Sequence, residues 1–223
     1  MHYDIVLVDI DNTLLDFDAG TAESLTKLLA SFGLELTEER LARFFEINNA
    51  LWKAYEHGEI EKSYIFSSRF GKYLGEMGIE TDSLAANGLY AKGLSESAVL
   101  MPHTMELLQQ LKGKVKLYAV TNGVTTTQTP RLEKSGLLPY FDGVFISEQM
   151  GCKKPEAEFF DKVFAAIGIT DRSRTVILGD SLTSDMQGGR NAGIKTCYFG
   201  TDPDDRCDFS ITDLTQFPSI LGM

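Results

Sequence analysis

Five short apolar runs along the chain predict the strands of a sheet. The runs are rich in β-branched residues and show no sustained alternation of apolar and polar positions, so both faces of each strand are expected to be buried. Strands of that kind are typical of a parallel sheet that is covered by helices on both sides. The five runs are Ile5–Val8, Val115–Val120, Val144–Ile146, Thr175–Leu178 and Thr196–Phe199.

Helical patterns lie between the last four of these runs. Their bounds follow from proline, which is favoured near the start of a helix, and from glycine, which is favoured directly after its end. The patterns cover Arg131–Leu137 with a stop at Gly136, Pro155–Ile167 before Gly168, and Ser184–Ala192 before Gly193. Strand and helix therefore alternate, which predicts a doubly wound, Rossmann-like α/β fold.

The chain from about residue 17 to about residue 97 has a different pattern, since apolar residues recur there at i, i+3, i+4 and i+7. The first such set is Leu25, Leu28, Leu29 and Phe32. We expect four helices with short connections, inserted after the first strand. A chain of 223 residues can hold one domain with a large insertion, or two domains. We therefore predict an α/β core from residues 1–16 and 98–223 and a helical domain from residues 17–97.

Charge and cysteine content narrow the class of partner. A formal net charge of −11 repels nucleic-acid backbones and anionic membranes, so we expect a small-molecule substrate, no nucleic acid and no membrane. The three cysteines form no CxxC pair, which favours a reducing compartment. The N-terminus reaches only a short apolar stretch before two aspartates, and predicts neither a signal peptide nor an anchor. We expect a cytoplasmic protein, and its oligomeric state stays open.

Polar residues of unusually reactive types follow the predicted strands. In open α/β sheets, ligands bind beyond the carboxyl ends of the strands, so residues at those ends are expected to converge. The residues are Asp9 and Asp11 after the first strand, Thr121 and Asn122 at the end of the second, Lys154 after the third, and Asp180 and Asp185 after the fourth. They predict one acidic pocket that requires a cation.

The first pair of aspartates suits phosphate-ester chemistry. Asp9 is a feasible nucleophile toward phosphorus, but the alkoxide is a poor leaving group unless an acid protonates it. Asp11, two residues further on, is the candidate for that second task.

The other polar residues suit a metal and a phosphate. Three carboxylates and a phosphate dianion cannot share a pocket without a compensating cation, because like charges within about 4–6 Å raise one another's pKa values. Oxygen ligands beside a phosphate indicate Mg²⁺. The transferred group carries charge on its equatorial oxygens, which a lysine, a hydroxyl and loop N–H groups can hold. The carboxylates are those of Asp9, Asp180 and Asp185, and the phosphate candidates are Lys154, Thr121 and Asn122.

Four sequence motifs in this order resemble those of the haloacid dehalogenase (HAD) superfamily. They are DIDNT at 9–13, TNG at 121–123, Lys154 before Pro155, and GDSLTSD at 179–185. The resemblance covers nearly the whole chain and implies that the helical insertion is a type C1 cap. Carried over by motif position, the resemblance implies that Asp9 is the nucleophile and a metal ligand, and that Asp11 is the acid/base and binds the metal through its backbone carbonyl. It implies that Thr121 and Asn122 contact the phosphate and that Lys154 stabilises its charge. It also implies that Asp180 is a metal ligand and that Asp185 is a further carboxylate at the metal, bound directly or through water. The resemblance implies Mg²⁺.

The order and spacing of these residues bear on two other classes of function. A phospho-accepting receiver module is disfavoured, because its phosphorylated aspartate lies on a middle strand without an acid/base partner two residues on. A dehalogenase would lack the carboxylate of Asp11, whereas a sugar phosphomutase stays open. Arg131, at the start of a predicted helix, is expected to form a surface ion pair rather than to bind phosphate.

A second resemblance concerns the substrate. The stretches 121–160 and 47–60 resemble the bacterial pyrimidine 5′-nucleotidase branch of the superfamily, which implies substrates such as UMP, dUMP and dTMP. A phosphatase for phosphoglycolate or a sugar phosphate is the alternative. Asn48 and Trp52 share one helical face at i, i+4 and are the candidates for contact with the base. The neighbouring Leu51, Tyr55 and Phe44 favour the alternative interpretation, in which Trp52 belongs to the core of the cap.

Overall fold

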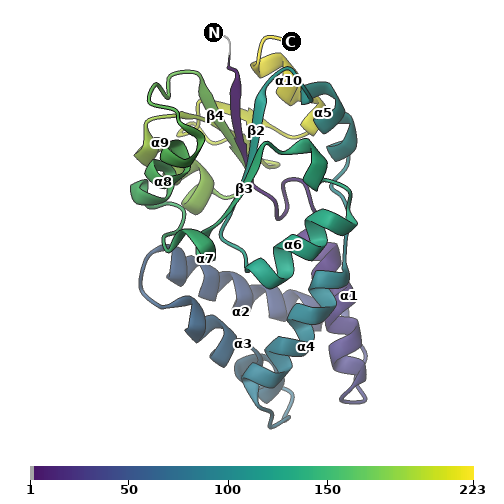
Figure 1. Ribbon diagram of the computed structural model, residues 1–223. Helices are drawn as coiled ribbons and strands as arrows, with labels where there is room; N and C mark the ends of the chain where they lie inside the picture. Colours follow the sequence, from purple (N-terminus) through teal and green to yellow (C-terminus); the bar gives the residue numbers. More distant parts are fainter. Residues whose placement is uncertain (1–2) are drawn as a thin grey trace. The chain divides into compact units, whose positions relative to one another are not determined.

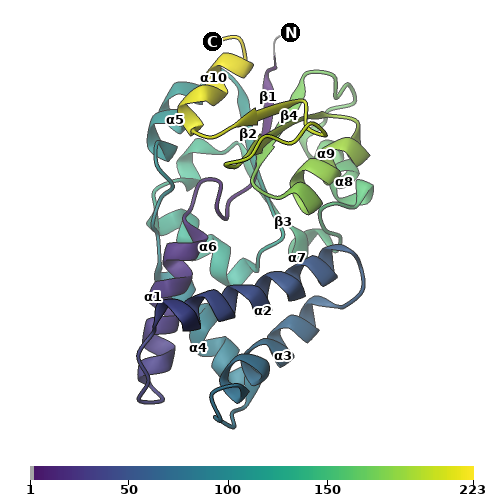
Figure 2. The same ribbon diagram turned by 180° about the vertical axis from the view of Figure 1, so that it is seen from behind.

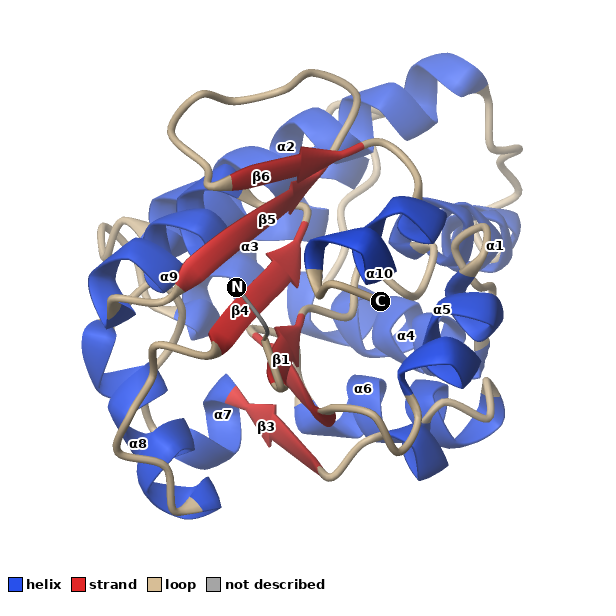
Figure 3. Ribbon diagram, turned by 90° about the horizontal axis from the view of Figure 1, so that it is seen from above, coloured by secondary structure: helices blue, strands red, loops and turns tan. Residues whose placement is uncertain are grey.

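The computed structural model describes residues 3–223, and Met1 and His2 lie outside the described residues. Its centre is a six-stranded sheet in the order β3-β2-β1-β4-β5-β6, in which every neighbouring pair is parallel (Figure 3). The strands are β1 Ile5–Val8, β2 Lys116–Thr121, β3 Gly143–Ile146, β4 Thr175–Gly179, β5 Lys195–Phe199 and β6 Phe209–Ile211. The strand order reverses beside β1, which is the place where such sheets bind ligands.

The sheet is buried on both faces, as the unalternated runs predict. Alternate residues of β1 belong to two different apolar clusters, Val6 and Val8 to one and Ile5 and Leu7 to the other. Helix α5 (Thr104–Leu111) contributes to the first cluster, and helix α8 (Ala157–Ile167) to the second. The doubly wound α/β fold is therefore confirmed.

The other helices between and after the strands have four to ten residues. They are α6 Thr125–Lys134, α7 Ser147–Met150, α9 Gln187–Ala192 and α10 Phe217–Ile220, with 3₁₀ turns at Leu138–Tyr140 and Leu214–Gln216 and a π turn at Leu182–Met186. Helices α5 and α10 pack against each other, and the chain ends beside α10 (Figure 1). No helix within residues 3–223 combines the length and the apolar character needed to cross a membrane.

The chain divides into two compact units, one formed by Met1–Phe17 with Ala98–Met223 and the other by Asp18–Ser97. The second contains four helices, and α3 lies against both α2 and α4 (Figure 2). The four helices are α1 Phe17–Ala30, α2 Glu38–Glu56, α3 Lys62–Gly75 and α4 Ser83–Glu96. Phe44 of α2 packs on Phe70 and Tyr73 of α3, with ring centroids 5.6 and 5.3 Å away. That this unit acts as a cap stays a prediction.

The largest differences from the predicted elements are the start of one helix and one missed strand. The helix predicted from Arg131 begins six residues earlier, at Thr125, whose backbone N–H donates to the side chain of Glu148 at 2.9 Å. The residue that caps this helix comes from a distant part of the chain, and threonine has a low helix propensity. The local sequence therefore does not indicate the first turn of the helix. Strand β6 is missed because it has only three residues, one of them the exposed Ser210.

Candidate active site

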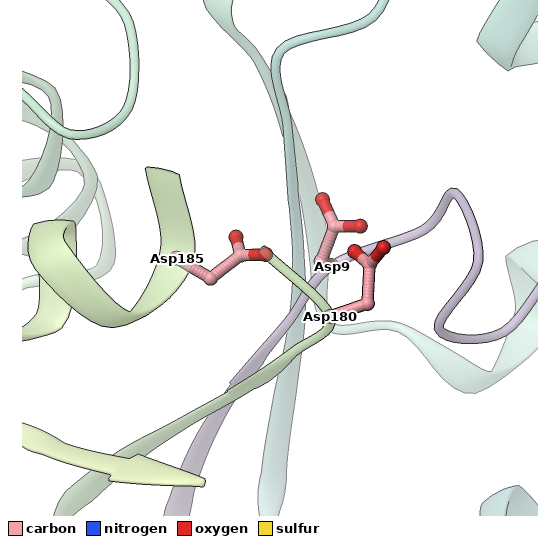
Figure 4. Close-up of side chains that lie close together, drawn as sticks. All are labelled: Asp9, Asp180 and Asp185. Carbon is pink, nitrogen blue, oxygen red and sulfur yellow. The ribbon is translucent and has the colours of Figure 1, made fainter. Parts of the chain in front are cut away.

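Three predicted site aspartates converge at the carboxyl end of the sheet (Figure 4). Asp9 follows β1 and Asp180 follows the neighbouring β4, and the Asp9 N–H donates to the carbonyl of Leu178 at 2.9 Å. Asp185 lies in the π turn. One carboxylate oxygen from each of the three aspartates lies within 4.8 Å of the other two. Such a group of oxygens can hold one metal ion.

The turn after β4 aims Asp185 back at the sheet. The Ser184 N–H donates to Ser181 Oγ, and the Ser181 N–H donates to Asp185 Oδ2, both at 3.1 Å. A Cβ on Gly179 would lie 2.4 Å from Cγ of Asp185. Glycine is therefore required at this position because the carboxylate occupies the space of a side chain.

The loop after β1 is closed by its own residues. Asn12 has a φ of 54°, in the left-handed region that asparagine tolerates better than most residues. Its N–H donates to the carbonyl of Leu15 at 2.7 Å, and its Oδ1 accepts from the N–H of Phe17 at 2.9 Å. This turn fixes the backbone that carries Asp11.

Lys154 joins two of the three aspartates. Its buried Nζ donates to Asp9 Oδ1 at 2.5 Å, to Asp185 Oδ1 at 2.6 Å, and to the carbonyl of Val120 at 2.9 Å. The backbone of Lys154 is held by Asn122, whose Oδ1 accepts from the Lys154 N–H at 2.9 Å and whose Nδ2 donates to the Lys154 carbonyl at 2.8 Å. The Asn122 side chain therefore positions the lysine.

Thr121, the other predicted phosphate contact, ends β2 in the same unit. Its Oγ1 accepts from the N–H of Gly123 at 3.0 Å and from Nε2 of Gln128 at 3.1 Å. Because a hydroxyl that accepts two bonds still carries one hydrogen, Thr121 can donate to an oxyanion. Its role in phosphate binding stays a prediction.

The electrostatics of the site favour a divalent cation. Burial raises the pKa of Asp9 most strongly, the Lys154 ammonium lowers it, and the Asp185 charge raises it again, to about 8 overall. Burial and the charge of Asp9 also raise the pKa of Asp180 well above its usual range. Burial lowers the pKa of Lys154, but the charges of Asp185 and Asp9 outweigh that effect and raise it. One ammonium thus faces three carboxylates, and an all-oxygen donor set of this charge fits Mg²⁺.

Asp11 is held by two residues that the sequence did not single out for this purpose. Arg131 Nη1 pairs with Asp11 Oδ1, and Gln128 Nε2 donates to Asp11 Oδ2 at 2.5 Å. The expectation of a surface ion pair for Arg131 is wrong, since Arg131 is only 1% exposed. Gln128 and Arg131 lie one turn apart on α6, and the spacing could have suggested a shared face if the start of that helix had been predicted correctly.

The predicted substrate contacts Asn48 and Trp52 lie on α2, in the helical unit. Asn48 is buried, and its Oδ1 accepts from Arg69 Nη1 at 2.8 Å. Trp52 is half-buried, with its ring edge-on to Tyr55 at 5.7 Å and Lys62 Nζ 5.9 Å from its centroid. Contact of either residue with a substrate stays a prediction.

Fold and site together define a class of enzyme, and comparison with known proteins agrees. The haloacid dehalogenase-like hydrolase family model matches residues 3–193. The chain belongs to this family and is a hydrolase, so the receiver-module alternative is excluded.

Three similar proteins share most of their length with this chain. The HAD-hydrolase YfnB of Bacillus subtilis is 38% identical over 200 residues, which cover 90% of this chain and 85% of YfnB. The pyrimidine 5′-nucleotidase PynA of Streptococcus pneumoniae is 40% identical over 200 residues, 89% of this chain and 84% of PynA. The pyrimidine 5′-nucleotidase YjjG of Escherichia coli is 33% identical over 198 residues, 89% of this chain and 86% of YjjG.

A solved structure is also similar over its full length. The crystal structure of YfnB bound to magnesium has a TM-score of 0.95 and 36% sequence identity, and the match covers 100% of both chains.

Proposed function

We propose that this hydrolase is a Mg²⁺-dependent phosphatase that forms an aspartyl-phosphate on Asp9, and that its substrates are pyrimidine nucleoside 5′-monophosphates. The observation that carries the reaction type is the meeting of Asp9, Asp180 and Asp185 around Lys154 at the end of the sheet. The names of PynA and YjjG support the substrate class.

The proposed metal site uses the oxygens of Asp9, Asp180 and Asp185 and the backbone carbonyl of Asp11. Mg²⁺ bound there would neutralise charge on the phosphoryl oxygens and on the carboxylates. The raised pKa values of Asp9 and Asp180, which a bound cation would lower, support this assignment, and YfnB has been crystallised with magnesium.

The proposed reaction has two steps. A carboxylate oxygen of Asp9 attacks phosphorus, the bond from phosphorus to the ester oxygen breaks, and Asp11 donates its proton to that oxygen. Asp11 then takes a proton from water as the water attacks phosphorus, and inorganic phosphate leaves with Asp9 regenerated. Lys154, Thr121 and the backbone at Asn122 stabilise the transferred group.

The substrate class is tested by comparing kcat/KM for dUMP, dTMP, dAMP, dGMP and phosphoglycolate with Mg²⁺ present. We expect preference for the two pyrimidine nucleotides, and preference for a purine nucleotide or for phosphoglycolate would refute it. Phosphate release without a bisphosphate activator separates this activity from that of a phosphomutase.

The role of Trp52 is tested separately by Trp52→Ala. We expect this variant to lose discrimination between dUMP and dAMP, because an aromatic surface for the base is removed. Tyr64→Ala is the matched control, since Tyr64 is an exposed aromatic residue of the same unit that also has a lysine over its ring. Unchanged discrimination in Trp52→Ala would remove this residue from the substrate contacts and leave the activity itself in place.

A further inference from the structure

Both carboxylate oxygens of Asp11 are occupied by side chains of helix α6. Arg131 Nη1 pairs with Oδ1, and Gln128 Nε2 donates to Oδ2. The same two side chains are linked to each other, since Arg131 Nη1 lies 3.3 Å from Gln128 Oε1. Gln128 Nε2 also reaches Thr121 Oγ1. The group therefore connects the loop after β1 with the end of β2.

Burial of this group lowers the stability of the fold. Gln128 and Arg131 are each 1% exposed, and within residues 3–223 Nε and Nη2 of Arg131 have no hydrogen-bond partner. A buried guanidinium with donors left unsatisfied is destabilising, and such groups are found where function requires them.

The glycine that follows the end of β2, Gly123, leaves room for the Gln128 side chain. A Cβ on Gly123 would lie 2.3 Å from Nε2 of Gln128 and 2.6 Å from its Cγ. The glycine after Asn122 thus allows the Gln128 side chain to cross the backbone and reach Asp11. The contact depends on backbone geometry as well as on the two side chains.

We propose that Arg131 and Gln128 are positioning residues that fix the carboxylate of Asp11 for proton transfer to and from the ester oxygen and water. This inference rests on the proposed function, in which Asp11 is the acid/base. An aspartate side chain has two rotatable bonds, and a misplacement of about 1 Å can cost about 100-fold in rate. Two partners, one on each oxygen, define both the position and the plane of the carboxylate.

The test compares an ester that needs protonation of its leaving group with one that needs less. The substrates are dUMP and 4-nitrophenyl phosphate, and the variants are Arg131→Met, Arg131→Lys and Gln128→Leu. We expect Arg131→Met to lower kcat/KM, which reports the transfer of the phosphoryl group to Asp9, about tenfold more on dUMP than on 4-nitrophenyl phosphate, and Gln128→Leu to act in the same direction. Arg131→Lys should recover part of the loss, because it keeps the charge without the planar fork.

Two controls separate positioning from support of the fold. Arg172→Met removes another arginine of the same unit, one that pairs with Asp161 and packs on Phe164, and should leave the ratio of the two rates unchanged. If Arg131 acts through Asp11, then Arg131→Met should add no further selectivity in an Asp11→Asn background.

The outcomes distinguish this inference from the proposed function. Equal losses of kcat/KM on both esters, or a full further loss in the Asp11→Asn background, would overturn the positioning role while the phosphatase activity of the wild type stands. A wild type that hydrolyses neither ester would overturn the proposed function and this inference with it. Should Arg131→Met fail to fold, Arg131→Lys and Gln128→Leu carry the same comparison.

Discussion

Replacing Lys154 by methionine should lower the unfolding free energy when no metal is bound, because the site then holds three carboxylates and no cation. The lysine Nζ makes bonds to Asp9 and Asp185 in a place where all three side chains are almost fully buried. Methionine keeps much of the volume and removes the charge and the three hydrogen bonds. The carboxylates stay buried without their cation, and their desolvation is no longer compensated.

The expected loss of unfolding free energy is large in metal-free buffer. Breaking a buried ion pair by removing one partner costs about 3–5 kcal/mol, and here one lysine serves two carboxylates. A metal ion bound by the same carboxylates restores part of the missing positive charge. We therefore expect Mg²⁺ to stabilise Lys154→Met more than it stabilises the wild type.

The assay is urea unfolding at pH 7.5, with EDTA and then with saturating Mg²⁺, followed by circular dichroism. Lys195→Met is the control, because Lys195 pairs with Asp208 at the surface of the same unit, where a lost ion pair costs little. A Lys154→Met variant that loses no more stability than Lys195→Met in EDTA would refute the reasoning, since the carboxylates would then be protonated or well solvated.

Three further predictions concern the same group of residues. Asp180→Ala should raise the Mg²⁺ concentration for half-maximal activity more than Asp185→Ala does, because Asp185 is already bonded to Lys154; the opposite order would exchange their assignments. Without metal, unfolding free energy should fall as the pH rises from about 4 to about 8, because the folded-state pKa of Asp9 is raised from 3.8 to about 8; a flat urea-unfolding profile in EDTA over this range would contradict it. Gly179→Ala should lower both the melting temperature and kcat, because its Cβ would overlap Asp185, whereas Gly75→Ala, with nothing within 4 Å, should not.

The sheet and the meeting of the aspartates could be predicted from local sequence. The first strand was predicted at Ile5–Val8, the bounds that the structure has. The carboxyl ends of neighbouring parallel strands share one edge, so an aspartate directly after β1 and another directly after β4 must be close. Asp9 and Asp180 illustrate this rule.

The surroundings of Asp11 could not be predicted in the same way. Its partners depend on where α6 begins, and the N–H of the first residue of that helix donates to the side chain of Glu148, 23 residues further along the chain. The bonds of Gln128 and Arg131 to Asp11 span 117 and 120 residues. Such contacts follow from tertiary packing, and hydrophobic periodicity carries no information about them.

The most direct test of the proposed mechanism is to trap the phosphoryl group on the enzyme. Wild type, Asp9→Asn and Asp11→Asn are each mixed with dUMP that carries a radiolabelled phosphate, quenched in acid within the first turnover, and assayed for label on the protein. The mechanism predicts label on the wild type and no label on folded Asp9→Asn, whose turnover should fall by several orders of magnitude. Protein-bound label in Asp9→Asn, or ordinary turnover by that variant, would contradict Asp9 as the nucleophile.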